Sequence, residues 1–304
     1  MKSLGCFLSV LILTNTAWPC ANFTGSGTKF DGSAAKSSHA YGAMRLRAAI
    51  NRNLGNDGKE IEAQLRGATN FNDRSDYSIA LMYLGRATDA VALLEKLETE
   101  RPGEYFVAAN LGTAYELSGN NQKALKWITE GIRRNPDSHE DTEWLHARIL
   151  KAKIAESNDK AYFEKHSVLE LEPGVVSETV TLDGKSFSAI KLAEAIEHQL
   201  GERLQFVKPP DAPVASLLFD YAAIEAATRS LEGAKKILTM ASDYGYPRAR
   251  IEPLLRDYDQ KISDRRLKDY LVYGLIGAGV IALLVWLYKR GIFVISSRDL
   301  KKRV

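Results

Sequence analysis

Residues 105–138 read YFVAANLGTAYELSGNNQKALKWITEGIRRNPDS, and the preceding window, residues 71–104, reads FNDRSDYSIALMYLGRATDAVALLEKLETERPGE. Small and apolar residues stand at matching places in the two windows, and equivalent markers lie 34 residues apart. The markers are Tyr77, Ser78, Leu81, Gly85, Ala90, Leu94, Leu97 and Pro102 in the first window, and Leu111, Gly112, Tyr115, Gly119, Ala124, Ile128, Gly131 and Pro136 in the second. An internal period of this length is typical of stacked-repeat proteins.

Each window predicts a pair of helices that run in opposite directions. Apolar and small residues recur at helical spacing over residues 111–118 and again over 124–131, so each stretch predicts one amphipathic helix. Gly119 gives the backbone freedom for a tight reversal, and Pro136 ends the second helix because proline cannot continue the hydrogen-bond ladder. Gly112 is small where the two helices should cross.

The pattern of residues 105–138 resembles the tetratricopeptide repeat family, whose repeats carry Leu-Gly, Tyr, Gly, Ala, an aromatic or aliphatic residue, Ala and Pro in this order. Residues 71–104 match more loosely, with Ser78 in place of the glycine and Leu81 in place of the tyrosine. Residues 215–247 resemble a third, degenerate copy. The resemblance implies an all-α fold, a tetratricopeptide-like helical-repeat superhelix that holds a partner in its concave groove.

The composition predicts a folded protein and argues against a nucleic-acid partner. Of 304 residues, 45% are hydrophobic and 26% are charged, and the formal net charge is +3. The positive balance comes from the C-terminal tail, since acidic residues slightly outnumber basic ones in the rest of the chain. A nucleic-acid-binding domain would concentrate basic residues on one face.

The first 21 residues predict a secretory signal, because a lysine is followed by a short apolar run and then by small residues. Both cysteines, Cys6 and Cys20, lie in this segment, so the mature chain would contain no disulfide and no cysteine metal site. A lipid anchor on Cys20 is the alternative, although Trp18-Pro19 does not resemble the small residues that precede a lipidated cysteine.

Residues 270–288, YLVYGLIGAGVIALLVWLY, contain no charged residue and predict a transmembrane helix. At roughly 1.5 Å per residue the helix is about 28 Å long, close to the thickness of the hydrocarbon core. Tyr270 and Trp286 lie near its ends, where aromatic rings favour the membrane interface. The basic tail that follows favours a cytosolic C-terminus, and with the signal it predicts a domain on the periplasmic face of a bacterial inner membrane.

Between the repeats and this helix the repeat register breaks. The alternation around Asp183-Gly184 predicts either a small β-hairpin or an extended loop, and a helix is expected from Ile190 to Leu204. The helical patterns before residue 71 predict a pair of helices, with a turn over 53–58, that caps the repeats. In chain order the predicted parts are a signal peptide (1–21), a flexible leader (22–38), helical repeats (39–157, with core repeats 71–104 and 105–138), an irregular insertion and helix (158–214), a degenerate repeat and connecting helix (215–268), a transmembrane helix (270–288) and a basic cytosolic tail (289–304).

The sequence carries no convincing catalytic or cofactor motif, and we predict that the protein is not an enzyme and uses no cofactor. Gly277-x-Gly279-x-x-Ala282 matches a dinucleotide fingerprint, but no strand precedes it. His139 and His146 could approach each other at a helix start, yet they lack the paired spacing of a zinc helix. An enzymatic alternative places a site in residues 158–214 and requires convergence of Glu170, Glu172, His166 and Asp183.

We therefore expect function to reside in the groove, which the first helix of each repeat lines in the resembled family. Family members that clamp a terminal carboxylate use lysines with asparagines, and here Asn110 has no lysine beside it in the repeats. The residues that the resemblance implies for partner binding are Asn72, Ser75, Asp76, Ile79, Met82, Tyr83, Phe106, Ala109, Asn110, Thr113, Glu116 and Leu117.

This mixture of aromatic, apolar and acidic residues favours an extended or helical protein segment with apolar and basic side chains as the ligand. The predicted function is a membrane-tethered scaffold for protein–protein interaction. The alternative from another class is a non-catalytic subunit or assembly factor of a larger envelope complex.

Overall fold

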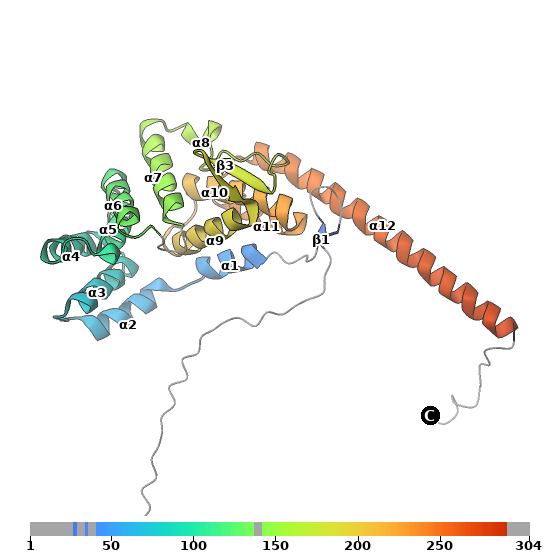
Figure 1. Cartoon of the computed structure of the whole chain (residues 1–304), viewed down its shortest axis with the longest axis horizontal. Coiled ribbons are helices and arrows are strands. Elements are labelled where there is room, and N and C mark those ends of the chain that lie inside the picture. The colour runs from blue at the N-terminus through green and yellow to red at the C-terminus, as the bar shows by residue number, and fades with distance from the viewer. Residues whose placement is uncertain (1–26, 29–33, 36–40, 137–141, 291–304) are drawn as a thin grey trace, which may run out of the picture.

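The computed structural model of the chain describes residues 27–28, 34–35, 41–136 and 142–290 (Figure 1). The predicted signal peptide with Cys6 and Cys20, most of the predicted leader, His139 and the tail beyond residue 290 lie outside the described residues.

The described residues are mostly helical. Two small antiparallel sheets pair β1 (Gly27–Thr28) with β2 (Ala34–Ala35) and β3 (Thr179–Leu182) with β4 (Lys185–Ser188). The helices are α1 (Tyr41–Ile50), α2 (Leu54–Leu65), α3 (Phe71–Tyr83), α4 (Ala87–Glu100), α5 (Tyr105–Leu117), α6 (Asn121–Arg134), α7 (Glu143–Asn158), α8 (Tyr162–Lys165), α9 (Ala189–Phe206), α10 (Ala212–Thr228), α11 (Leu231–Asp243) and α12 (Arg248–Lys289).

Two apolar cores divide the molecule into two lobes. We call α2 to α6 the repeat lobe, and α1 with α8 to α12 the C-terminal lobe (Figure 1). Helix α7 lies between the lobes and contributes to both cores: Ala147 and Leu150 pack in the repeat lobe, whereas Leu145 and Ile149 pack in the C-terminal lobe. Helix α7 therefore has one apolar side for each core and joins the two lobes.

The repeat lobe contains the two helix pairs that the internal period predicts, α3 with α4 and α5 with α6. Gly85 and Gly119 have φ values of 74° and 87°, a left-handed conformation that glycine adopts without strain, and each follows the first helix of a pair. A Cβ atom on Gly112 would lie 2.5 Å from Cδ1 of Ile128, so glycine allows the close crossing of α5 and α6.

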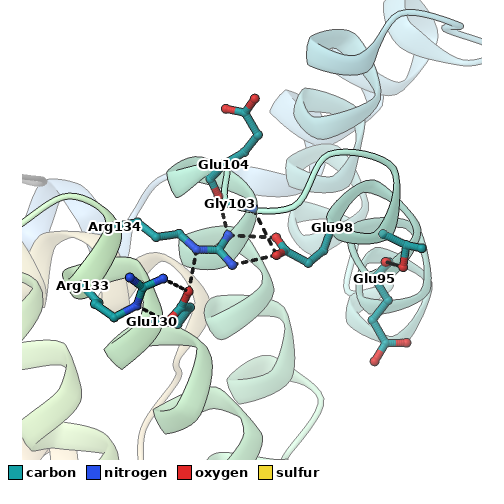
Figure 2. Close-up of polar contacts among 8 residues, drawn as sticks. Glu95, Glu98, Gly103, Glu104, Glu130, Arg133 and Arg134 are labelled. Carbon is teal, nitrogen blue, oxygen red and sulfur yellow. Dashed lines mark hydrogen bonds and ion pairs between the residues drawn. The ribbon is translucent and has the colours of Figure 1, made fainter.

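An ion-pair cluster fastens one repeat to the next (Figure 2). Nη2 of Arg134, at the end of α6, lies 2.6 Å from Oε1 of Glu98 on α4, and Nη1 donates to the backbone oxygen of Glu104 at 2.8 Å. Glu130 accepts from Nε of Arg134 at 2.9 Å. Because the arginine side chain is only 9% exposed, its fork is held in one orientation between α4, α5 and α6.

The expected capping pair before residue 71 is wrong as a pair, because its two helices pack in different lobes. Helix α2 packs on α3, but α1 packs on α9 and α11, and Ala43 and Leu46 are buried in the C-terminal core. The turn expected over 53–58 is also too long. Asn53 caps α2 by accepting a hydrogen bond from the backbone nitrogen of Asn56, so the residues after it are already helical.

The segment before α9 is irregular but firmly attached. The carboxylate of Asp220, on buried helix α10, accepts hydrogen bonds from Oγ of Ser167 at 2.7 Å and from the backbone nitrogens of Leu169 and Leu171 at 2.9 and 3.1 Å. The predicted hairpin is confirmed, with Asp183 and Gly184 both in the left-handed region between β3 and β4. The helix expected from Ile190 to Leu204 is confirmed as α9.

Helix α12 runs without a break for 42 residues, from the C-terminal lobe into the apolar stretch at 270–288. Its first half packs on α11 through Ile251, Tyr258 and Ile262, and its second half extends away from the rest of the described chain (Figure 1). Among the described residues, α12 is the helix that is long and apolar enough to cross a membrane. A continuous helix therefore connects the folded lobes to a candidate membrane span.

Candidate functional site

A pocket of about 300 Å³ lies where helices α5, α7 and α9 meet, between the two lobes. It is lined by Ala109, Asn110, Thr113, Glu116, Leu117, Glu143, His146, Lys153, Gln199, Glu202, Arg203, Phe206 and Val207. Another depression, of about 380 Å³, lies between the end of α2 and helix α4, and none of the predicted groove residues lines it. The pocket at α5 is therefore the cavity that the repeat pattern and the structure have in common.

Charged side chains from two other helices, α7 and α9, converge on Glu116 at the floor of this pocket. Its carboxylate pairs with the guanidinium of Arg203 from α9, with Nε2 of His146 at 2.7 Å and with Nζ of Lys153 at 2.8 Å. Burial alone would raise the pKa of Glu116, but the charges of Arg203, His146 and Lys153 outweigh it and hold that pKa well below its usual value. Glu116 is therefore ionised and fully engaged.

His146 lies between two carboxylates, since its Nδ1 is 3.5 Å from Oε2 of Glu143 on the side opposite Glu116. Burial lowers the pKa of the imidazole, but the hydrogen bonds to Glu116 and Glu143 raise it by more, so the net shift of this pKa is upward. Both ring nitrogens can donate to a carboxylate only when the ring is protonated. The geometry therefore favours the imidazolium form.

The apolar wall of the pocket continues onto the first repeat. The ring of Phe206, the last residue of α9, lies 5.6 Å from the ring of Tyr83 between centroids. The guanidinium of Arg52 lies over the ring of Tyr83, 5.9 Å from its centroid, and its Nη1 donates to Oε1 of Gln205 at 2.8 Å. Tyr83 is thus covered by side chains of the same protein.

Five residues predicted for the groove, all from the second repeat, line the pocket: Ala109, Asn110, Thr113, Glu116 and Leu117.

The predicted groove residues of the first repeat are more dispersed. Ser75 and Met82 are buried, and Ile79 is partly buried against the core of the repeat lobe. Asn72 and Asp76 are exposed. Tyr83 contacts Phe206 as described, and Phe106 packs edge-to-face on Phe71 with ring centroids 6.0 Å apart.

The other eight lining residues were not foreseen, because they come from α7, α9 and the residue after α9, outside the two core repeats. Arg203 and Glu116 are separated by 87 residues, and no local sequence spacing predicts a contact at that separation. The lysine missing beside Asn110 within the repeats is supplied across the pocket by Lys153, although its ammonium group is bound to Glu116.

The residues of the enzymatic alternative are not gathered into one site. Nδ1 of His166 lies 3.1 Å from Oε1 of Glu170, but Glu172 pairs with Arg250 and Asp183 pairs with Arg148. Within the part of the chain that the structure describes, no group of three or more His, Cys, Asp or Glu residues could hold a metal ion.

Comparisons of the chain with family models, with curated proteins and with solved structures give no significant match.

Proposed function

We propose that the protein is a membrane-tethered scaffold of the tetratricopeptide type, which binds a segment of another protein in the groove between its lobes. The observation that carries the proposal is the pocket at α5, five of whose lining residues are those that the repeat pattern assigns to partner binding. The pocket combines four apolar side chains with six ionisable groups and two amides, which could fix the orientation of a bound protein segment.

The proposed orientation places the two lobes on the extracytoplasmic side, at the periplasmic face of a bacterial inner membrane. Lys289 and Arg290 directly follow the apolar part of α12, and basic residues at the end of a span favour the cytosolic side. The N-terminal signal pattern supports the same orientation. Because α12 continues from the lobe without a linker, the groove would be held at a fixed height above the membrane.

The proposal is tested by photocrosslinking of the full chain in cells. A photoreactive residue is placed at Asn110 or Thr113, which line the pocket, and the matched control is placed at Lys126 on the exposed outer surface of α6. We expect one dominant crosslinked protein from the two pocket positions and none from Lys126. Equal capture from both surfaces, or no capture from the pocket, contradicts the proposal.

The same experiment separates the second class of function. A subunit or assembly factor of a larger envelope complex would co-purify with that complex whether or not the pocket is altered. We expect instead that Thr113→Arg, which fills the pocket with a long side chain, abolishes crosslinking from Asn110. A similar substitution at the control surface, Thr129→Arg on exposed α6, should leave crosslinking intact.

A further inference from the structure

The last turn of α9 reaches out of its own lobe and into the repeat lobe. Most of α9 belongs to the C-terminal core, where Leu192, Ile196 and Leu200 are fully buried. Arg203 and Phe206 instead contact the repeat helices, through Glu116 on α5 and Tyr83 on α3. Since the two residues are three positions apart, they project from one side of the helix.

These contacts have the character of a recognition interface more than of an apolar core. An arginine on a buried carboxylate and an aromatic ring against another ring are the residue classes that dominate binding energy at protein interfaces. The arginine side chain is 8% exposed and the Glu116 side chain 7%, so the ion pair is shielded from water. Around it lie the open part of the pocket and its amide side chains, Asn110 and Gln199.

We infer that the last turn of α9 is an internal ligand of the repeat groove, and that a partner segment enters by presenting an arginine and an aromatic ring one helical turn apart in place of Arg203 and Phe206. The inference rests on the proposed function and specifies the chemistry of the partner.

Charge supports a basic occupant over an acidic one. Without Arg203, the pocket floor would hold Glu116 and Glu143 against Lys153 and His146, and Glu202 stands at the rim. A buried carboxylate that loses its arginine is strongly destabilised unless another cation replaces it. A partner arginine satisfies Glu116, whereas a partner carboxylate would face it directly.

The test uses the purified full chain in detergent micelles and a fluorescent peptide with the sequence of α9, residues 189–206. A control peptide carries R203A and F206A and keeps the remaining apolar positions, and its binding to protein-free micelles is measured beside that of the native peptide. The groove is emptied in the protein by R203Q with F206A. Binding is measured by fluorescence anisotropy.

We expect the emptied protein to bind the native peptide at least about tenfold more tightly than the control peptide, a difference of about 1.4 kcal/mol. The wild-type protein should discriminate less, because the peptide must first displace Arg203 and Phe206 from the groove. Failure of the emptied protein to discriminate overturns the inference, and so does equal discrimination by the wild-type protein.

Two additions keep the test decisive. If circular dichroism shows that R203Q with F206A loses helix, the milder R203K with F206L replaces it under the same criterion. Adding Glu116→Gln to the emptied protein should remove the preference for the arginine-bearing peptide, which assigns binding to this groove. Peptide discrimination without a crosslinked partner at Asn110 would refute the proposed function and support the internal ligand. A crosslinked partner at Asn110 without peptide discrimination would support the proposed function and refute the internal ligand.

Discussion

The two lobes are built on different principles. In the repeat lobe each helix packs on its neighbours in sequence, from α2 to α6. In the C-terminal lobe, α1 packs on α9 and α11, and the carboxylate of Asp220 binds a loop about fifty residues earlier in the chain. The repeat lobe is therefore specified mainly by local pattern, whereas the C-terminal lobe depends on contacts between distant segments.

The lobes also differ in where they keep their charges. Apart from Glu116 at the junction between the lobes, the acidic residues described in the repeat lobe stay at least partly exposed, as Glu98 does in its pair with Arg134. The C-terminal lobe buries Asp220, Glu197 and Glu225, and burial raises the pKa of Asp220 and of Glu225 to about 7. A buried carboxylate must be satisfied by specific donors, so this lobe is the more sensitive to single substitutions.

Asp220→Ala should have the largest effect on stability. It leaves one hydroxyl and two backbone N–H groups without their acceptor, and at about 1–3 kcal/mol for each buried group we expect a loss of more than about 3 kcal/mol. Hydrogen exchange should show lost protection in residues 167–171 and in α10. Asp183→Ala, on the exposed hairpin turn, is the matched control, and equal effects of the two substitutions would contradict the role of Asp220.

Glycine substitutions compare the two lobes directly. A Cβ atom at Gly42 on α1 would lie 1.8 Å from the hydroxyl of Tyr221, whose position is fixed by a 2.6 Å hydrogen bond to Glu197. Overpacking costs about 1–3 kcal/mol, and we expect Gly42→Ala to lie at the upper end and to expose α9 and α11. At Gly112 the nearest obstructing atoms are Cδ1 and Cγ1 of Ile128, at 2.5 and 2.6 Å, and this side chain has no hydrogen bond that fixes its position.

Gly112→Ala should therefore cost about 1 kcal/mol, because the gain in helix propensity offsets part of the overlap. Thermal unfolding and hydrogen exchange of the two variants check the order. A larger loss of stability for Gly112→Ala would contradict the expected order. A loss of exchange protection for Gly42→Ala that is confined to α1 would show that α1 does not stabilise the C-terminal lobe.

How far the sequence predicts the structure follows the same division. The period of 34 residues and the glycines at the turns predicted α3 to α6, and local turn chemistry at Asp183-Gly184 predicted the hairpin. Turn residues and helical spacing act over a few positions, so they can be read without knowledge of the fold. The packing of α1 on α9 has no such signature, since the apolar side of an amphipathic helix does not specify which helix it packs against.

The candidate site divides likewise. The resemblance to the tetratricopeptide repeat implied the α5 wall, including Asn110 and Glu116, because the first helix of each repeat lines the groove in that family. It could not predict His146, Arg203 and Phe206, whose approach depends on how the second lobe docks. The acidic residue Glu116 at a predicted groove position was the available signal for a cationic partner, since a carboxylate that is buried there requires one from elsewhere in the chain.

The junction between the lobes should be less stable at alkaline pH. The pKa of His146 is raised in the folded protein, so its contribution is complete below the unfolded value of 6.5 and is lost as the pH rises through the folded value. The pKa of Glu116 is lowered, so its contribution is lost only in acid, as the pH falls through its folded value. We therefore expect the melting temperature to fall between pH 6 and pH 9.

Two buried carboxyl groups change in the same pH range. Because burial raises the pKa of Asp220 and of Glu225 from 3.8 and 4.5 to about 7, these two groups also lower stability as the pH rises, but only up to about pH 7. The decisive quantity is the difference between the wild type and His146→Gln, which lacks the titrating ring. An identical pH dependence of the two proteins would show that His146 does not control the junction.

The smallest expected effect lies on the outer surface of the repeat lobe, where Arg134 and Arg133 share Glu130 (Figure 2). Arg134→Ala removes the pair with Glu98 and the bond to the backbone of Glu104, so we expect a loss of about 1 kcal/mol in unfolding free energy and faster exchange at the α4–α5 turn. Arg133→Ala should cause no measurable change in unfolding free energy, since that side chain is 72% exposed and pairs with Glu130 of its own helix.

Unfolding of both variants in urea at low and high salt checks these expectations, because a shielded ion pair keeps its contribution to stability as the salt concentration rises. If the two variants behave alike, the repeats are held together by apolar stacking alone, and the repeat lobe needs no counterpart to the buried polar contacts of the C-terminal lobe.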